Sequence, residues 1–470
     1  MTESFDAIVI GTGQAGPALA VRLAKAGRRV AIVERKRFGG TCVNNGCIPT
    51  KTLIASARAA HVARVAERYG LRIDGDVRVD MARVKARKDA IVAESTANVE
   101  AWLRGTANVT VVLGHARFVE PHAVAVDGRM LAAPQIFINT GGRPAAPRIE
   151  GLDRVAYLTS TGILELDRLP EHLIVVGGSY IGLEFAQMYR RFGSQVTVVE
   201  MAPRLVARED DAVSAALRQI LEGEGIAIRV SAECLAVEPR GDAVAVHARC
   251  SEGPGAIVGS HLLIAAGRVP NTHDLGLEVA GVETDAKGYI VVDDSLATRV
   301  PGLYALGDVN GRGAFTHTAF NDFEIVAANV LDGDPRRVSD RIPVYALFTD
   351  PPLARAGMTK REARLSGRPT LVGRRTMARV GRARERGETL GFMEVLVDAE
   401  TKRIVGAALL GIEADEAIHG IIDIMNAGAP YTAIQRAVHI HPTVSELIPT
   451  LLGELAPLGP ARDGAGAAAA

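Results

Sequence analysis

The sequence predicts an α/β protein that contains two similar strand–helix–strand units and a separate α+β region at its C-terminal end. A glycine-rich strand–helix–strand pattern occurs at residues 5–34 and again at 172–200, with the same internal spacing. From about residue 343, prolines are followed by strand-like runs of a different pattern. A chain of 470 residues also has room for about three domains of ordinary size.

The two units follow the same order of elements. The first begins with the apolar run "FDAIVI", which is typical of a buried parallel strand. "GTGQAG" follows at once and opens the helical pattern "PALAVRLAKAG", and the next strand, "RRVAIVE", ends at Glu34. The second unit, "HLIVVGGSYIGLEFAQMYRRFGSQVTVVE", repeats this order and ends at Glu200. In both units the acid lies 23 positions after the first glycine of the turn.

The glycines of these turns have a physical reason. A diphosphate must nearly touch the backbone N–H groups and the positive end of the helix, where a Cβ would block it. The acid at the end of the second strand can then bind the ribose hydroxyls. One such pattern is a weak signal, but two copies in register predict two Rossmann-like dinucleotide sites. The candidate residues are Gly11, Gly13, Gly16 and Glu34 in the first unit and Gly177, Ser179, Gly182 and Glu200 in the second.

Further strands are predicted after the second unit. "GDAVAVHARC" and "HLLIAAGRVPNT" are expected to close that unit, and "GLYALGDVNG" is an apolar strand that runs into a turn with Asp308. "GFMEVLVD" and "RIVGAALLG" are strands of the C-terminal region. The predicted domains are 1–150 with 273–342 for the first unit, 151–272 for the second, 343–455 for the C-terminal domain, and a disordered low-complexity tail at 456–470.

Composition limits the partners of the chain. Lys+Arg and Asp+Glu number 54 each, so no basic excess favours nucleic acid or an anionic membrane, and a small-molecule partner is expected. No apolar run reaches the ~18 residues that cross a bilayer, and the N-terminus resembles neither a signal peptide nor a transit sequence. Four cysteines are too few for a disulfide-stapled secreted fold. We therefore expect a cytoplasmic protein in which any disulfide is catalytic.

Half of the cysteines lie in "GGTCVNNGCIPTK", at Cys42 and Cys47. A bridge between them is feasible if Cys42 lies at a helix entrance and Cys47 just inside the helix. Two structural cysteines or half of a zinc site are the alternatives. Zinc ligands usually come as two C-x2-C pairs, and no second pair exists here, so no metal site is predicted.

The functional interpretation of the pair is a redox disulfide whose thiolate is stabilised by the N-terminus of a helix. The two dinucleotide sites supply the electrons that such a disulfide needs. A nicotinamide gives a hydride, a flavin accepts it, and the flavin passes electrons to the disulfide.

The motifs together resemble one known family. "GGTCVNNGCIPTK", "INTGGRP", "AAGRVPNT", "LYALGDV" and "HIHPTVSE" are similar to motifs of the flavin-dependent pyridine nucleotide–disulfide oxidoreductases, which include dihydrolipoamide dehydrogenase, glutathione reductase and mercury(II) reductase. The resemblance spans nearly the whole chain, in the family's order. It implies FAD in the first unit, NAD(H) or NADP(H) in the second, and a homodimer formed by the C-terminal domain.

The resemblance also implies roles for single residues. Cys47 would face the flavin as a thiolate, Cys42 would meet the substrate, and Lys51 would lie near the flavin N5, paired with Glu184. Tyr180 would cover the nicotinamide pocket. The first-unit glycines and Glu34 would hold the ADP half of FAD, and Thr41 and Asp308 its pyrophosphate and ribityl chain. Further cofactor contacts are expected at Gly40, Ala116, Thr140, Gly141 and Gly267.

A histidine and an acid near the C-terminus complete the expected site. A lone histidine beside a proline is more often a structural residue, but thiol–disulfide exchange needs an acid–base group that titrates near neutral pH. His441 and Glu446 match the His–Glu dyad that the family's partner subunit contributes. His439 is expected to be structural, and Cys234 and Cys250 to be ordinary thiols.

The nucleotide and the substrate are predicted with less detail. Glu200 repels a 2′-phosphate and favours NAD(H), although Arg204 nearby would neutralise a phosphate if it turned inward. "REDDAVSAAL" and "FTDPPLARAGMT" are similar to a bacterial branch of mercuric reductase-like and reactive-chlorine-resistance reductases, the latter acting on copper(II). True mercury(II) reductases carry a C-terminal cysteine pair, which this chain lacks after Cys250.

We expect a small-molecule disulfide or thiol-reactive compound as the acceptor first, a soft metal ion second and lipoamide third. A different class of function is an FAD-binding redox sensor without turnover. The combination of Lys51, Glu184, His441 and Glu446 argues against it, because a sensor needs no acid–base dyad.

Overall fold

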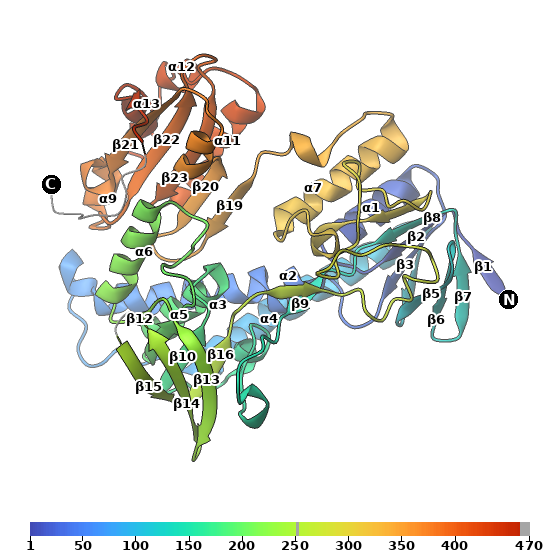
Figure 1. Ribbon diagram of the computed structural model, residues 1–470, viewed down its shortest axis with the longest axis horizontal. Helices are drawn as coiled ribbons and strands as arrows, with labels where there is room; N and C mark the ends of the chain where they lie inside the picture. Colours follow the sequence, from blue (N-terminus) through green and yellow to red (C-terminus); the bar gives the residue numbers. More distant parts are fainter. Residues whose placement is uncertain (251–252, 461–470) are drawn as a thin grey trace.

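The computed structural model describes residues 1–250 and 253–460 and has three lobes (Figure 1). The first lobe lies on the right of the view, the second at the lower left and the third at the upper left. In the first lobe a parallel sheet has the order β18–β8–β2–β3–β4, which is the strand order of a dinucleotide-binding sheet. Its strands are β2 (Ala7–Ile10), β3 (Val30–Glu34), β4 (Val109–Leu113), β8 (Gln135–Ile138) and β18 (Leu303–Ala305).

The first lobe is built from two distant parts of the chain. Strand β18 pairs with β8 in parallel, so the segment after residue 273 completes the sheet that begins at Ala7. Helices α1 (Ala15–Lys25) and α7 (Thr316–Ala327) pack against each other, and α7 continues into the π-helical turn Ala328–Asp332. A second sheet of the lobe has the order β1–β7–β6–β5, with bounds Thr2–Ser4, Arg129–Ala132, Ala123–Val126 and Ala116–Glu120.

The second lobe repeats the dinucleotide topology. Its parallel sheet has the order β12–β11–β10–β16, and α5 (Tyr180–Phe192) connects the first two strands in sequence. All four inner residues of β10 after His172 are buried, as expected for a parallel strand that is covered on both faces. The remaining bounds are β10 (His172–Val176), β11 (Gln195–Val199), β12 (Ala227–Arg229), β16 (His261–Ile264) and α6 (Asp211–Gly223).

The strand "GDAVAVHARC" does not close this parallel sheet, which corrects the prediction. It forms β14 (Ala243–Cys250), the middle strand of an antiparallel sheet with β13 (Glu233–Arg240) and β15 (Gly253–Gly259). Only the second half of β14 contains polar residues, His247 and Arg249, so its apolar first half does not distinguish an antiparallel strand from a buried parallel one. The side chains of Cys234 and Cys250, which lie on these strands, fall outside the described residues.

The third lobe is the predicted α+β region. Its antiparallel sheet has the order β19–β20–β23–β22–β21–β24, with α8 to α13 around it. Strand β24 (Ala456–Pro457) pairs with β21, so the segment expected to be a disordered tail begins with two residues of this sheet, and residues 461–470 lie outside the described part. The other strands are β19 (Val344–Leu347), β20 (Leu353–Gly357), β21 (Thr370–Thr376), β22 (Phe392–Asp398) and β23 (Ile404–Leu410).

Short helices complete the third lobe and the connections. The third-lobe helices are α8 (Lys360–Leu365), α9 (Gly381–Glu385), α10 (Ala414–Ala417), α11 (His419–Asn426), α12 (Thr432–Gln435) and α13 (Leu447–Leu452). Single 3₁₀ turns occur at Ala66–Tyr69, Leu152–Arg154, Gly162–Glu165, Gly307–Asn310, Val338–Asp340 and Met377–Arg379. The chain crosses between the first and second lobes twice, where β9 (Gly142–Pro144) pairs with β17 (Arg268–Pro270).

Each lobe has buried apolar residues of its own, and one further apolar cluster joins the lobes. Helix α3 (Cys47–Arg64) leaves the first lobe and packs on α5 of the second, together with α4 (Met81–Arg104) (Figure 1). One buried cluster joins Leu53 of α3, Leu183 of α5, Leu347 of β19 and Phe392 of β22. Successive side chains of β22 point to opposite faces of the sheet. Phe392 joins the cluster between the lobes, whereas Met393, Val395 and Val397 pack in the cluster of the third lobe.

The glycine turns show why each unit needs its last glycine. A Cβ on Gly16 would lie 2.1 Å from the carbonyl oxygen of Gly11, and a Cβ on Gly182 would lie 1.9 Å from that of Gly177. Gly11 and Gly177 themselves have φ of 104° and 119°, which side chains rarely adopt. The first and last glycines are therefore required by the protein itself.

We predict that Gly182→Ala lowers the free energy of unfolding of the second lobe by about 2 kcal/mol, because the new methyl group overpacks the turn. Scanning calorimetry or fluorescence-monitored melting measures this. Gly223→Ala is the matched control, because no atom lies within 4 Å of its Cβ position at the end of α6. We expect Gly223→Ala to be neutral or slightly stabilising. Equal melting temperatures for the two variants would contradict the argument.

Candidate active site

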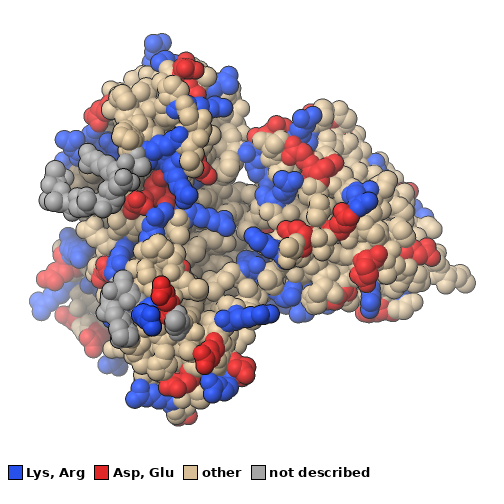
Figure 2. All heavy atoms as spheres, in the orientation of Figure 1, with Lys and Arg blue, Asp and Glu red and all other residues tan. Residues whose placement is uncertain are grey.

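A cavity of about 1340 Å³ lies where the three lobes meet. Figure 2 shows the surface hollowed at this place, with Lys and Arg side chains around the hollow. Fourteen of the predicted site residues line the cavity, although they come from four separate stretches of the chain, 11–51, 116–141, 180–184 and 308. They are Gly11, Gly13, Glu34, Gly40, Thr41, Cys42, Cys47, Lys51, Ala116, Thr140, Gly141, Tyr180, Glu184 and Asp308.

The other predicted residues do not line this cavity. Gly16 and Gly182 lie inside helices α1 and α5, where they pack against their own turns. The ribose-binding end of the second unit, with Gly177, Ser179, Glu200 and Gly267, is also outside the cavity lining. The lining therefore joins most of the predicted first-unit residues to Tyr180 and Glu184 of the second unit.

The two cysteines lie on two helices instead of one. Cys42 is inside the short helix α2 (Gly40–Asn45), and Cys47 is the first residue of α3, after the break at Gly46. The structure thus differs from the arrangement that the sequence gives as a condition for a bridge, with Cys42 at a helix entrance and Cys47 just inside the helix. The break needs a glycine, because a Cβ at Gly46 would lie 2.8 Å from the carbonyl oxygen of Thr41. Cys47 therefore lies at the N-terminus of the longer helix, where a negative charge is favoured.

The two sulfurs have different proton affinities. The pKa of Cys47 is lowered to about 6, first by the hydrogen bond that the Cys42 thiol donates to it, although burial opposes the shift. The hydroxyl of Thr316, 3.2 Å from the Cys47 sulfur, and the charge of Lys51 lower this pKa further. The pKa of Cys42 is raised, because its proton is held in the hydrogen bond to Cys47 and because of burial. The pair thus carries its thiolate on Cys47.

Lys51 and Glu184 meet beside the cysteines. Lys51 Nζ donates to Glu184 Oε2 at 2.6 Å, and Glu184 Oε1 accepts from the backbone N–H of Phe348 at 3.0 Å. The ammonium also lies 4.5 Å from the centre of the Phe348 ring, a cation–π contact. Glu184 is buried, so these partners compensate its loss of water.

The diphosphate turn of the first unit is held open by side chains of its own. Glu34 accepts the N–H and the hydroxyl of Thr12, which fixes the acid at the end of β3. Buried Asn139 donates to the carbonyl oxygens of Gly11 and Gly13, both at 3.2 Å. A Cβ on Gly13 would meet no backbone atom closer than 3.8 Å, so this glycine leaves room on the cavity side. The turn fits a diphosphate group.

Asp308 and Tyr180 also line this cavity. Burial raises the pKa of the Asp308 carboxyl, and the Arg268 guanidinium at 3.6 Å opposes this shift. Burial also raises the pKa of the Tyr180 hydroxyl. Tyr180 is the first residue of α5, and its ring lies 5.5 Å from that of Phe315.

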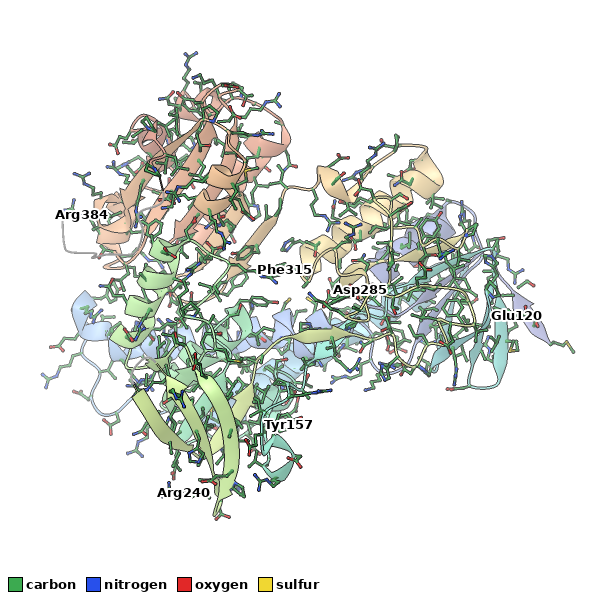
Figure 3. The ribbon with its side chains drawn as sticks, viewed as in Figure 1. Glu120, Tyr157, Arg240, Asp285, Phe315 and Arg384 are labelled. Carbon is green, nitrogen blue, oxygen red and sulfur yellow. The ribbon has the colours of Figure 1, made fainter. Side chains whose placement is uncertain are left out.

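Sequence reasoning missed an aromatic wall of the cavity. The Phe315 ring lies between those of His317 and Tyr345, with interplanar angles of 9° and 2°. Figure 3 places Phe315 in the middle of the molecule, between the first and third lobes. His317 Nε2 donates to the carbonyl oxygen of Val344 at 2.8 Å, and burial lowers its pKa. The stretch "AFTHTAF", residues 314–320, which includes the first residues of α7, was the available signal.

The His441–Glu446 pair forms as predicted but lies outside the large cavity of its own chain. His441 Nδ1 lies 2.9 Å from Glu446 Oε2 and 3.1 Å from Oε1. The imidazole is 79% exposed, and the apolar residues Val438 and Ile440 beside it are exposed as well. Glu446 and His439 line a separate cavity of about 320 Å³.

The described residues contain no group of three or more His, Cys, Asp or Glu side chains placed to hold a metal ion. Among them there is also no helix with the length and apolar character needed to cross a membrane.

The fold has two sheets of dinucleotide-binding topology, and a dithiol lines the cavity beside the first of them. Residues 5–322 match the family described as pyridine nucleotide-disulphide oxidoreductase, and residues 344–452 match its dimerisation domain. The chain belongs to this family, whose members use FAD and NAD(P)H, which confirms the resemblance, the fold class and the cofactor prediction.

Several known proteins are similar to the chain over most of its length. It is 36% identical to the probable pyridine nucleotide-disulfide oxidoreductase RclA of Escherichia coli K12, over 94% of this chain and 98% of that protein. It is 34% identical to the dihydrolipoyl dehydrogenase of Thermus scotoductus (94% and 96%) and to the mercuric reductase of Streptomyces lividans (94% and 94%).

Solved structures are similar as well. The HOCl-induced flavoprotein disulfide reductase RclA of Escherichia coli superimposes with a TM-score of 0.87 at 36% identity, covering 95% of this chain and 99% of that one. The Cu(II) complex of the same protein also has a TM-score of 0.87 at 36% identity, with coverage of 96% and 99%.

We predict that the ultraviolet absorbance of the Cys47 thiolate, in protein reduced with dithiothreitol and freed of flavin, titrates with a midpoint of about pH 6. The thiolate is present above this pH and is lost as the pH falls through it, because the pKa is depressed. Thr316→Val removes a hydrogen bond to the thiolate and should raise the midpoint. Cys47→Ser is the control and should remove the transition. A midpoint near that of a free thiol would refute the assignment.

Proposed function

We propose that the protein is an NADH-dependent flavoprotein disulfide reductase with Cys42 and Cys47 as its redox pair, working as a cytoplasmic homodimer. The observation that carries the proposal is the Cys47 sulfur itself. Its pKa is lowered to about 6, and it lines the same cavity as the dinucleotide turn of the first unit. A stabilised thiolate at the end of a dinucleotide cavity is suited to electron transfer between a flavin and a disulfide.

The first unit would hold FAD. The turn from Gly11 to Gly16 and the acid Glu34 would bind its ADP half, and Thr41 and Asp308 would lie along its pyrophosphate and ribityl chain. Further contacts are proposed at Gly40, Ala116, Thr140 and Gly141, which line the same cavity. When bound, FAD supplies the step that takes a hydride from a nicotinamide and passes two electrons to a disulfide.

The second unit would bind NADH in preference to NADPH. The carboxylate of Glu200 accepts the N–H groups of Gly178 and Ala202, so it stays at the end of β11, where a 2′-phosphate would meet its charge. Arg204 does not turn toward this position. Its guanidinium donates to the carbonyl oxygens of Ala207 and Glu209 and pairs with Asp211 at 2.9 Å.

The dyad would act on the partner subunit's dithiol. His441 and Glu446 lie outside the cavity of their own chain, beside exposed apolar side chains, and the matched dimerisation domain begins at residue 344. This supports the predicted C-terminal domain from about 343. Glu446 would orient the imidazole, and the imidazole would move protons to and from sulfur.

Disulfide reduction then proceeds by two exchanges. The Cys42 sulfur attacks the substrate, so the substrate S–S bond breaks, a mixed disulfide forms and one substrate thiolate leaves. Cys47 attacks Cys42, the second substrate thiolate leaves, and the Cys42–Cys47 disulfide forms. His441 of the partner subunit would take the proton of the Cys42 thiol as its sulfur attacks and give it to the first substrate thiolate that leaves, and the second thiolate takes its proton from water. Two electrons from NADH regenerate the dithiol.

We predict that Cys42→Ser lowers disulfide reduction by on the order of a thousandfold or more, because the attacking sulfur is lost. It should leave the long-wavelength thiolate–flavin absorbance band after anaerobic addition of NADH, since Cys47 remains. Cys47→Ser should remove this band.

The control in this experiment is His441→Ala, which should slow thiol exchange and spare flavin reduction by NADH. The reverse pattern of the two cysteine variants would mean that the sulfurs exchange their roles. A protein that takes up no flavin would refute the proposal as a whole. Flavin reduction without turnover of any acceptor would instead favour the alternative function, an FAD-binding redox sensor.

Reduction of a soft metal ion is the second candidate. His317 supports it, because its Nε2–H donates to Val344, which leaves the lone pair of Nδ1 available, and His317 lines the same cavity as the dithiol. Burial lowers its pKa and keeps the ring neutral, as a metal ligand must be. RclA, which is similar to this chain, has been solved as a Cu(II) complex. The described residues offer no third ligand close by, so we rank metal ions below disulfides.

We predict that steady-state NADH oxidation is faster with small disulfides than with Cu(II), Hg(II) or lipoamide, and that NADPH supports a lower kcat/KM than NADH. His317→Phe should keep the ring stacked on Phe315 and lower the rate with Cu(II) more than the rate with a disulfide. Turnover with lipoamide alone would overturn the ranking. If His317→Phe lowered the rates with Cu(II) and with a disulfide equally, His317 would only support the aromatic wall.

A further inference from the structure

We infer that Glu209 positions the loop 200–210 over the second dinucleotide turn and thereby sets the affinity for NADH. Glu209 is held by a hydrogen bond from Tyr345 and an ion pair with Arg355, both in the third lobe. The inference rests on the proposed function for the identity of the nucleotide. None of these three residues was singled out by the sequence, and Glu209 does not line the central cavity. Glu209 is thus a positioning residue.

The loop is bonded directly to the diphosphate turn. The N–H of Val206 donates to the carbonyl oxygen of Gly178 at 2.9 Å, and the N–H of Gly178 donates to Glu200. Leu205 packs so closely on Gly178 that a Cβ there would lie 2.7 Å from the Leu205 side chain. The backbone that would face the nucleotide diphosphate therefore takes its position from Leu205 and Val206.

Val206 has a backbone conformation that it would not adopt by itself. Its φ is 42°, and a β-branched residue with a positive φ is strained. Such a conformation persists only where the surrounding structure holds it. The carbonyl oxygen of Val206 accepts the N–H of Glu209 at 2.7 Å, so Glu209 holds the far side of this residue.

Glu209 is in turn fixed by the third lobe. Its carboxylate accepts the hydroxyl of Tyr345 and is paired with the guanidinium of Arg355. Glu209 and Arg355 are 2% and 3% exposed, so neither charge is free to move into water. A buried pair of this kind keeps its geometry, because separating it leaves two uncompensated charges. Asp210 adds a second link by accepting the N–H of Lys360, the first residue of α8.

The same tyrosine reaches the dithiol cavity. The Tyr345 ring stacks on Phe315 at 5.7 Å, and the next residue along the chain, Thr316, bonds to Cys47. The third lobe therefore holds the nucleotide loop with the hydroxyl of Tyr345 and the cavity wall with its ring. Removal of the hydroxyl alone weakens the hold on the loop, because Arg355 still pairs with Glu209, and it leaves the wall in place.

Tyr345→Phe should raise the KM for NADH about fivefold, because a hydrogen bond to a charged acceptor is lost and the strained loop is held less well. The kcat at saturating NADH should change less than twofold. Binding of NAD⁺ by titration calorimetry should weaken by the same factor as the KM rises. Tyr189→Phe is the matched control, because it loses a buried hydroxyl bond to Ile163 within the same lobe without touching the loop, and its KM should be unchanged.

A double-mutant cycle tests the strain directly. Glycine adopts a positive φ without penalty, so in a Val206→Gly background the loop keeps its conformation without the hydrogen bond from Tyr345 to Glu209. Tyr345→Phe should then raise the KM less than twofold relative to Val206→Gly alone. An unchanged KM in Tyr345→Phe, or a fivefold rise in both backgrounds, would overturn the inference. A wild-type protein whose flavin is not reduced by NADH would instead refute the proposed function.

Discussion

Three parts of the chain converge on one carboxylate, Glu184, and the position of the cavity depends on it. Glu184 lies on α5 of the second lobe, accepts from Lys51 on α3 of the first, and accepts from the N–H of Phe348 in the third. A buried carboxylate is stable only with such partners, so the three lobes are held around it. Because α3 begins at Cys47, the same contact fixes the dithiol relative to Tyr180 at the start of α5.

The charge of the dithiol is controlled mainly by its nearest neighbour. The hydrogen bond from Cys42 lowers the pKa of Cys47 more than Thr316 or Lys51 does. Lys51 and Glu184 act on Cys47 with opposite signs, since the ammonium lowers the pKa and the carboxylate raises it. The ion pair is thus more important for holding the lobes together than for charging the sulfur.

The similarity of the chain to its relatives does not identify the electron acceptor. The dinucleotide turns belong to a family in which RclA, a dihydrolipoyl dehydrogenase and a mercuric reductase are about equally similar to this chain, at 34–36% identity. Overall identity therefore does not separate their acceptors. The chain itself has His317 in the cavity wall, a hydrogen-bonded His441–Glu446 pair and no cysteine after Cys250.

The sequence by itself determined the two dinucleotide units, the C-terminal α+β region and the cysteine pair, because each is encoded by residues close together in the chain. It misplaced the strand at 243–250, since strand identity does not reveal which sheet a strand joins. Only the tertiary structure brought Thr316 to Cys47 and Tyr345 to Glu209, across 269 and 136 positions. The residues around Thr316 and Tyr345 in the sequence form no pattern that predicts these contacts, because the contacts arise only when the lobes pack together.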